Sequence, residues 1–177
     1  AGKKNYFINT CTIKSGDRFD VSSFDEERER ITSYLNNNGY YGFTKDFILF
    51  EADSSLGGYQ VDLNIKLREL RENKGTDQSE FISRPHRKYF IGDIFVHTNY
   101  DPYSINYTPE DTVRYEDLVV LFDEGSTLQP SLLAYTVFMR KGELYQKDDV
   151  ETTYRRFNEL GVFRAVNIRF DDVGAPD

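Results

Sequence analysis

Three carboxylates in one irregular stretch are the residues whose types and spacing could support acid–base chemistry. Asp101, Glu110 and Asp111 lie in residues 99–127, a segment rich in acids and tyrosines that also contains two prolines. Glycoside hydrolases use a pair of carboxylates held in a cleft, and the general acid of such a pair has a raised pKa. One hypothesis is therefore a hydrolase whose catalytic groups come from this stretch.

Two other groups of carboxylates have a structural explanation. Acidic residues are concentrated at residues 25–30 and 147–151, where amphipathic helices are predicted to begin. Negative charge in the first turn of a helix is stabilised by the helix dipole. These runs therefore indicate helix starts rather than a catalytic cleft.

The histidines and the cysteine give no pattern that is typical of a reactive site. His86 lies in a polar stretch, His97 ends a predicted strand, and neither has a second histidine at ligand spacing. Cys11 is the only cysteine, so neither an internal disulfide nor a cysteine-based zinc site can form. No nucleotide-binding or nucleophile-elbow motif is present. We expect no catalytic residue, no metal and no cofactor.

Composition and charge limit the class of protein further. The chain has 177 residues, of which 38% are hydrophobic, and it includes 13 Tyr and 14 Phe, so it can form a packed core. The net charge of −8 argues against nucleic acid as a partner, because phosphate binding needs clustered Lys and Arg. The longest apolar runs are far too short to span a bilayer.

The elements that would position these residues occur twice, in residues 16–50 and 142–170. Each copy has a glycine, an aromatic residue three positions later, an amphipathic helix, a second glycine and then an aromatic or apolar pair. A glycine at the end of a helix favours the left-handed conformation. The residues that define the unit are Gly16, Phe19, Leu35, Gly39 and Tyr40 in the first copy, and Gly142, Tyr145, Tyr154, Phe157, Gly161 and Phe163 in the second.

Strands are predicted to follow each helix. Residues 43–50 and 59–67 are expected to form a β-hairpin whose apolar face the helix covers, because residues 59–67 alternate strictly between apolar and polar. In the second copy, residues 164–170 alternate in the same way. A strand at 88–97 and a short helix at 129–139 are predicted before that copy.

These elements predict an α+β chain with two units. The first unit is residues 1–71 and is incomplete at its N-terminus, residues 72–87 are a linker, and the second unit is residues 88–177 and lacks its last strand. Residues 99–127 form an insertion in the second unit, with a short strand at 117–122. Such an insertion is either functional or a packed extra strand.

The combination of these motifs resembles the POTRA (polypeptide-transport-associated) domain. The resemblance rests on "GDRF…ERERITSYLNNNGYYGF" and "GELYQKDDVETTYRRFNELGVFRAVNIRF", and it covers roughly residues 10–69 and 88–170. It is closest to outer-membrane assembly factors of the bacterial surface-antigen family. It implies tandem units, each a small three-stranded mixed sheet covered on one face by two helices. The first copy departs from the pattern because it lacks the opening strand, and the second because of its insertion.

The resemblance implies a binding function in the periplasm and no enzymatic activity. Tandem POTRA units precede a C-terminal membrane β-barrel and receive unfolded outer-membrane proteins or secreted segments. An extended client can pair with the free backbone groups of an edge strand, a mode called β-augmentation. The expected client-binding residues lie on the strands after the helices: Phe43, Lys45, Phe47, Ile48, Leu49, Arg164, Val166, Ile168 and Arg169.

Three alternatives remain open at this point. The same segment is compatible with a translocation pore dedicated to one secreted partner. Accessory periplasmic proteins are a further class of partner that the resemblance leaves open. Each strand edge could also be covered by a neighbouring unit or by solvent alone.

Overall fold

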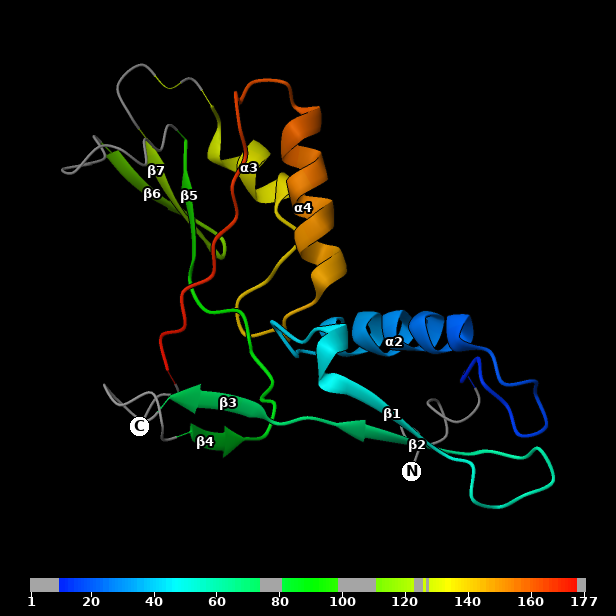
Figure 1. Ribbon diagram of the computed structural model, residues 1–177. Helices are drawn as coiled ribbons and strands as arrows, with labels where there is room; N and C mark the ends of the chain where they lie inside the picture. Colours follow the sequence, from blue (N-terminus) through cyan, green and yellow to red (C-terminus); the bar gives the residue numbers. More distant parts are fainter. Residues whose placement is uncertain (1–9, 74–80, 99–110, 123–125, 127, 175–177) are drawn as a thin grey trace. The chain divides into compact units, whose positions relative to one another are not determined.

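The structure is a computed structural model, and it describes residues 10–73, 81–98, 111–122, 126 and 128–174 (Figure 1). The chain divides into two compact units, Ala1–Lys88 and Tyr89–Asp177. Each unit contains helices and strands, which confirms the predicted α+β class.

The first unit is organised around helix α2 (Val21–Asn36). Asp20 forms the N-cap, and its carboxylate accepts a hydrogen bond from the backbone N–H of Ser22 at 3.0 Å. Phe24 and Ile31 are buried on one face of the helix, as the apolar spacing predicts. The remaining faces are largely polar, so α2 has one apolar face with which to cover a sheet.

A hairpin follows α2, but its first strand begins later than expected. Residues Lys45–Phe47 form a short 3-10 helix, η1, and strand β1 (Ile48–Asp53) begins only after it. β1 pairs antiparallel with β2 (Asp62–Leu67), with Ile48 opposite Leu67. The predicted strand at 43–50 is therefore correct only in its last part.

A second hairpin occupies the segment that was predicted to be a linker. β3 (Leu70–Asn73) and β4 (Phe81–Arg84) form a two-stranded antiparallel sheet inside the first unit. The polar, turn-rich composition of residues 72–87 concealed these strands, because it contains no alternating apolar row from which a hairpin could be predicted. The chain therefore passes from the first unit to the second at Lys88 and Tyr89 rather than through a free linker.

The second unit contains a three-stranded mixed sheet. Its strands are β5 (Ile94–His97), β6 (Asp111–Tyr115) and β7 (Leu118–Phe122), in the order β5-β7-β6. β7 pairs parallel with β5 and antiparallel with β6. The insertion thus supplies the central strand and one edge strand, whereas the sequence predicted only the strand at 117–122.

Helices α3 (Pro130–Thr136) and α4 (Lys147–Glu159) pack on one face of this sheet (Figure 1). Phe157 of α4 packs with Leu133 of α3 and Val120 of β7 in a single core. The buried members of this core are Leu118, Val120, Leu133, Ala134, Val137, Met139 and Phe157. This unit has two helices on one face of a three-stranded sheet, but β6 and β7 both precede the helices in the chain. The described residues of the first unit instead form two two-stranded sheets with one α-helix and η1, so the prediction of a three-stranded sheet with two helices in each unit is wrong there.

Only the second half of the predicted strand at 88–97 is a strand of the sheet, and the first half pairs with a loop. Its second half is β5, and its first half bonds to the loop before α4. The N–H of Ile91 donates to the carbonyl of Glu143 at 2.8 Å, and the N–H of Gly142 donates to the carbonyl of Ile91 at 2.7 Å. This pairing attaches the glycine turn before α4 to the start of the sheet.

Candidate strand-binding edges

The first predicted binding region, residues 43–49, is mostly core rather than a free edge. Phe43 and Ile48 are buried, with exposed fractions of 3% and 2%. Lys45 lies in η1, and its ammonium group pairs with Glu29 of α2 at 3.1 Å. Of the residues expected there, only Ile48 and Leu49 lie on a strand.

Phe43 and Phe47 instead form an aromatic contact with His86. The imidazole ring lies 4.8 Å from the ring centre of Phe43 and 4.6 Å from that of Phe47, edge-on to both. Its Nε2 atom is 2.8 Å from the carbonyl of Arg68, a distance at which Nε2–H donates to that oxygen. His86 therefore fixes the segment after β4 against the core of the first unit.

The outer edge of β1 is occupied by the side chain of Arg28. The Nε–H of Arg28 donates to the carbonyl of Ile48 at 3.4 Å, and the guanidinium carbon lies 5.0 Å from the ring centre of Phe50. Phe24 stacks on Phe50 at 5.0 Å. α2 thus covers the apolar face of β1 through Phe24, and its Arg28 binds the carbonyl of Ile48, the first outward carbonyl of the strand.

The other strand of the hairpin is uncovered, whereas the sequence predicted that the helix would cover both strands. Val61, Ile65 and Leu67 have exposed fractions of 38%, 44% and 55%. They belong to the alternating apolar row that was expected to lie beneath the helix. Only part of the signal was available: the single apolar stripe of α2 is wide enough for one strand while the alternation extends over two, which indicates that one strand stays uncovered but not which one.

The second predicted binding region, residues 164–170, runs as a long extended trace (Figure 1), but it is not a strand of any sheet in the described chain. Val166 and Ile168 are half-buried against the core of the second unit, while Arg164 and Arg169 are exposed. The side chains therefore alternate as in a strand. None of the backbone N–H and C=O groups of residues 164–169 bonds to another group of the described chain.

The glycines that bracket the two long helices share one backbone conformation. Gly16 and Gly142 before the helices, and Gly39 and Gly161 after them, all have positive φ, between 67° and 94°. Such values favour glycine because it has no Cβ. The two long helices are therefore bracketed by glycines in the same conformation, although their capping residues and the segments that follow them differ.

The aromatic residues of the two units have different surroundings. Tyr145 is buried and meets Phe170 edge-on at 5.5 Å, and Phe163 meets Phe157 edge-on at 5.7 Å. Phe19 and Tyr154 are exposed by 52% and 49%, so Tyr154 lies at the margin of the apolar stripe that was predicted for α4. In the first unit, Leu35 and Tyr40 pack against Ile31, Phe43 and Ile48.

A polar cluster holds the segment before α2 onto the helix. The carboxylate of Glu27, which is 1% exposed, accepts hydrogen bonds from the N–H and hydroxyl of Thr12 at 3.1 and 3.0 Å. Arg30 donates to both oxygens of Glu27, at 2.8 and 2.6 Å, and to the hydroxyl of Thr10 at 2.8 Å. Burial alone would raise the pKa of Glu27, but these hydrogen bonds and the charge of Arg30 lower it from 4.5 to about 2.

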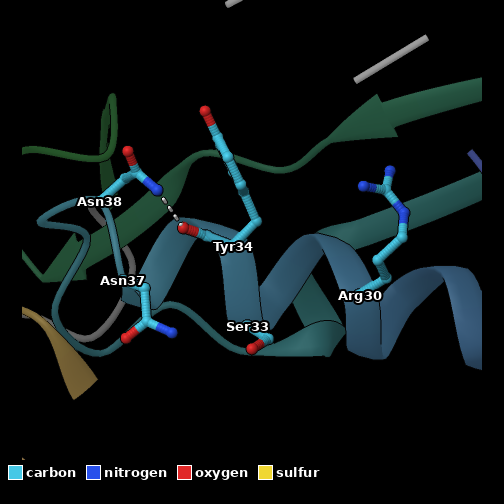
Figure 2. Close-up of a pocket in the computed structure, with 5 residues that line it drawn as sticks. All are labelled: Arg30, Ser33, Tyr34, Asn37 and Asn38. Atoms are coloured by element: carbon cyan, nitrogen blue, oxygen red, sulfur yellow. Dashed lines mark hydrogen bonds between the residues drawn. The ribbon is translucent and has the colours of Figure 1, made fainter. Parts of the chain in front are cut away.

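Next to this cluster is a hollow of about 550 Å³ on α2 (Figure 2). Its lining is formed by Arg30, Ser33, Tyr34, Asn37 and Asn38. The amide of Asn38 donates to the backbone carbonyl of Tyr34 at 2.8 Å, and Arg30 is already paired with Glu27. The hollow therefore offers polar groups that the chain itself uses, and it has no nucleophile–base pair.

The structure describes only one of the three carboxylates of the hydrolase hypothesis. Asp101 and Glu110 lie outside the described residues, and Asp111 is exposed at the start of β6, where its carboxylate accepts from the N–H of Thr112 at 2.7 Å. In the part of the chain that the structure describes, no three His, Cys, Asp or Glu side chains lie close enough together to hold a metal ion.

Burial raises the pKa of the Cys11 thiol.

Comparisons with known proteins give no further information: no family model, curated protein or solved structure matches this chain. Within the described residues, no helix has both the length and the apolar character needed to cross a membrane.

Proposed function

We propose that this chain is a POTRA-like segment of an outer-membrane protein, which binds unfolded client polypeptides in the periplasm by strand addition and delivers them for β-barrel assembly. Three features support this function. The sequence motif occurs twice, the bracketing glycines have the same backbone conformation, and residues 164–169 of the second unit form an extended segment whose backbone groups have no partner among the described residues. The partners are unfolded outer-membrane proteins and the barrel of the parent chain.

The observation that carries this proposal is the extended segment at residues 164–169. Its apolar side chains are anchored in the core of the second unit, while its backbone groups lack partners among the described residues. Backbone N–H and C=O groups without partners are stabilised when they pair with another strand, since each intramolecular hydrogen bond contributes about 1 kcal/mol net. The segment is held in the conformation that a client strand needs, so binding requires little ordering of the receptor.

Strand addition would also allow many different clients to bind. Main-chain hydrogen bonds are available to any extended sequence, so affinity does not depend on one side chain. The alternating burial of residues 164–169 leaves one row of side chains in solvent, including Asn167. A client that pairs with this segment would therefore meet polar neighbours on one face and apolar core on the other.

Site-specific photocrosslinking tests the proposal. A benzoyl-phenylalanine residue at Asn167 is expected to crosslink to unfolded outer-membrane proteins, whereas the same residue at Asn158, on the exposed face of α4, is the control. Both positions are exposed asparagines in the same unit, so they differ mainly in backbone environment. Equal crosslinking at the two positions, or none at Asn167, would contradict strand addition at residues 164–169.

The same experiment in cells separates assembly from dedicated secretion. Crosslinks from Asn167 to many barrel precursors are expected for an assembly role, and a single crosslinked species would indicate a translocation pore for one partner. No described feature favours the hydrolase hypothesis, since Asp111 is the only one of its three carboxylates that the structure describes, and it is exposed.

A further inference from the structure

Residues 163–170 run back along helix α4, from its end toward its start (Figure 1). Phe163 meets Phe157, in the last turn of α4, with the ring centres 5.7 Å apart. Phe170 meets Tyr145, which precedes the first turn of α4, with the ring centres 5.5 Å apart. Each end of the proposed client-binding segment therefore lies next to one end of the helix.

Carboxylates gather where the segment ends and α4 begins. Asp148 and Asp149 lie in the first turn of α4, where the helix dipole stabilises negative charge. Burial raises the pKa of Asp149, and the charges of Glu143 and Asp148 raise it further, so these three carboxylates lie close together. Asp171 and Asp172 follow the segment directly, and both are exposed.

Cations compensate the charge at this end only in part. Arg169 pairs with Asp171 at 3.1 Å. Arg140 lowers the pKa of Asp149, but burial and the neighbouring carboxylates raise it more. The carboxylate of Asp172 accepts a hydrogen bond from a backbone N–H and pairs with no cation of the described chain. The end of the segment is therefore negative.

The start of the segment is positive. Arg164 is exposed, and no carboxylate among the described residues pairs with it. Arg155 and Arg156, near the end of α4, both interact with one carboxylate, that of Glu159, at 4.0 and 3.3 Å. Cations near the C-terminus of a helix complement its dipole. The segment thus runs from a positive end to a negative end.

Backbone hydrogen bonds alone do not determine the direction of an added strand. Antiparallel and parallel ladders both satisfy the N–H and C=O groups, and the parallel ladder is only slightly less stable per residue. Opposite charges at the two ends of a site distinguish the two directions, because a reversed strand places like charges side by side. The charge pattern of this segment can therefore supply the information that its backbone lacks.

We propose that Arg164 and Asp172 set the direction of the client strand, with the acidic end of the client beside Arg164 and its basic end beside Asp172. This inference rests on the proposed function and adds to it the class of client that residues 164–169 select. A client with basic residues before its apolar core and acidic residues after it would pair antiparallel, so that charge and ladder agree. A client with the reverse order would pair parallel or place like charges together, and it should bind more weakly.

Fluorescence anisotropy with two labelled peptides tests this selectivity in the whole chain. Both peptides have a core of alternating valine and threonine, blocked termini and a dye at the same core position. One has lysines before the core and glutamates after it, and the other has the reverse order. We expect the lysine-first peptide to bind about fivefold more tightly at low salt. The difference should fall below about twofold at high salt, because exposed charges are screened.

Reversal of one charge tests the role of Arg164. In the Arg164→Glu chain, the preference for the lysine-first peptide should fall below about twofold. Arg18→Glu makes the same change at an exposed arginine of the first unit, and it should leave the preference intact. An unchanged preference in the Arg164→Glu chain would overturn the proposal. An equal loss in both chains would also overturn it, because net charge would then be the cause.

Paramagnetic broadening of amide signals measures the direction itself and requires no substitution in the chain. A spin label at the N-terminus of the lysine-first peptide should broaden the amide signals of Phe170 and Asp171. The same label at the C-terminus of that peptide should broaden those of Phe163 and Arg164. Equal broadening at both ends of the segment by one label would show that the strand has no preferred direction, and would overturn the proposal.

Failure of this inference can be distinguished from failure of the proposed function. If both peptides shift the amide signals of residues 164–169 and bind with equal affinity, the segment binds strands and only the selection of direction is wrong. If neither peptide binds or shifts these signals, the proposed function of the segment is wrong, and this inference is wrong with it.

Discussion

The Nε–H of Arg28 in α2 donates to the carbonyl of Ile48, the first residue of β1, at 3.4 Å. The same guanidinium lies over Phe50 and pairs with Asp25 at 2.7 Å. One side chain thereby joins the helix to the outer edge of the hairpin and covers that edge.

Substitution of Arg28 by Ala should weaken this attachment. We expect a loss of about 1 kcal/mol in the free energy of unfolding, because the cation–π contact and the packing of the aliphatic stem are lost. Urea denaturation followed by circular dichroism measures the change. Arg155→Ala, at an exposed position of α4, is the control and should change stability by less than about 0.5 kcal/mol. Equal effects of the two substitutions would show that Arg28 does not hold the edge.

Substitution of Glu27 by Gln should be more costly. It leaves Arg30 without its buried partner, and we expect a loss of about 3 kcal/mol in the free energy of unfolding. The exposed neighbour Glu26→Gln provides a matched control with the same chemical change. The measurement is again denaturant unfolding, and a loss for Glu27→Gln no larger than for Glu26→Gln would contradict the role assigned to the ion pair.

The pKa of Glu27 also predicts a dependence of stability on pH. Burial opposes ionisation, but the bonds from Arg30 and Thr12 outweigh it, and the folded-state pKa is about 2 against an ordinary value of 4.5. Because the folded pKa is the lower one, the stabilisation is fully present above about pH 5 and is lost as pH falls toward 2. Its full size is about 3 kcal/mol. The free energy of unfolding of the Glu27→Gln chain should therefore fall less steeply between these pH values, and parallel profiles would contradict this assignment.

Substitution of Gly161 by Ala should lower the stability of the fold because of its backbone conformation alone. Its φ is 67°, and a Cβ built there meets no atom within 4 Å, so the cost of Gly161→Ala is backbone strain without steric conflict. We expect a loss of about 1 kcal/mol. Gly92→Ala is the control, since Gly92 has equal space and a φ outside the left-handed region. Thermal unfolding measures both, and a neutral Gly161→Ala would indicate that the helix end relaxes.

The sequence predicted the helices well, because their apolar spacing and terminal glycines are local signals. Phe24, Ile31 and Phe157 are buried as the spacing required. Strand boundaries were less predictable, since pairing depends on a partner that the local pattern does not reveal. Residues 164–170 show this: the alternation was correct, but no described strand is hydrogen-bonded to the segment to make it part of a sheet.

The candidate sites were predicted only in part for the same reason. Phe43 and Phe47 looked like strand residues because they are apolar and aromatic, but η1 and His86 place them in a core contact. The uncovered β2 edge requires knowledge of how α2 lies on the hairpin, which is a tertiary property. Sequence alone could indicate that both strands are apolar on one face, but not which of them the helix covers.

Amide hydrogen exchange tests the central claim most directly. The exchange rates of residues 164–169 should be compared in the free chain and in the presence of an unfolded outer-membrane protein. Strand addition predicts that alternate amides in this segment become protected while the exposed face of α4 does not change. Unchanged exchange at residues 164–169, with protection confined to the helices, would show that clients are not held by the backbone of this segment.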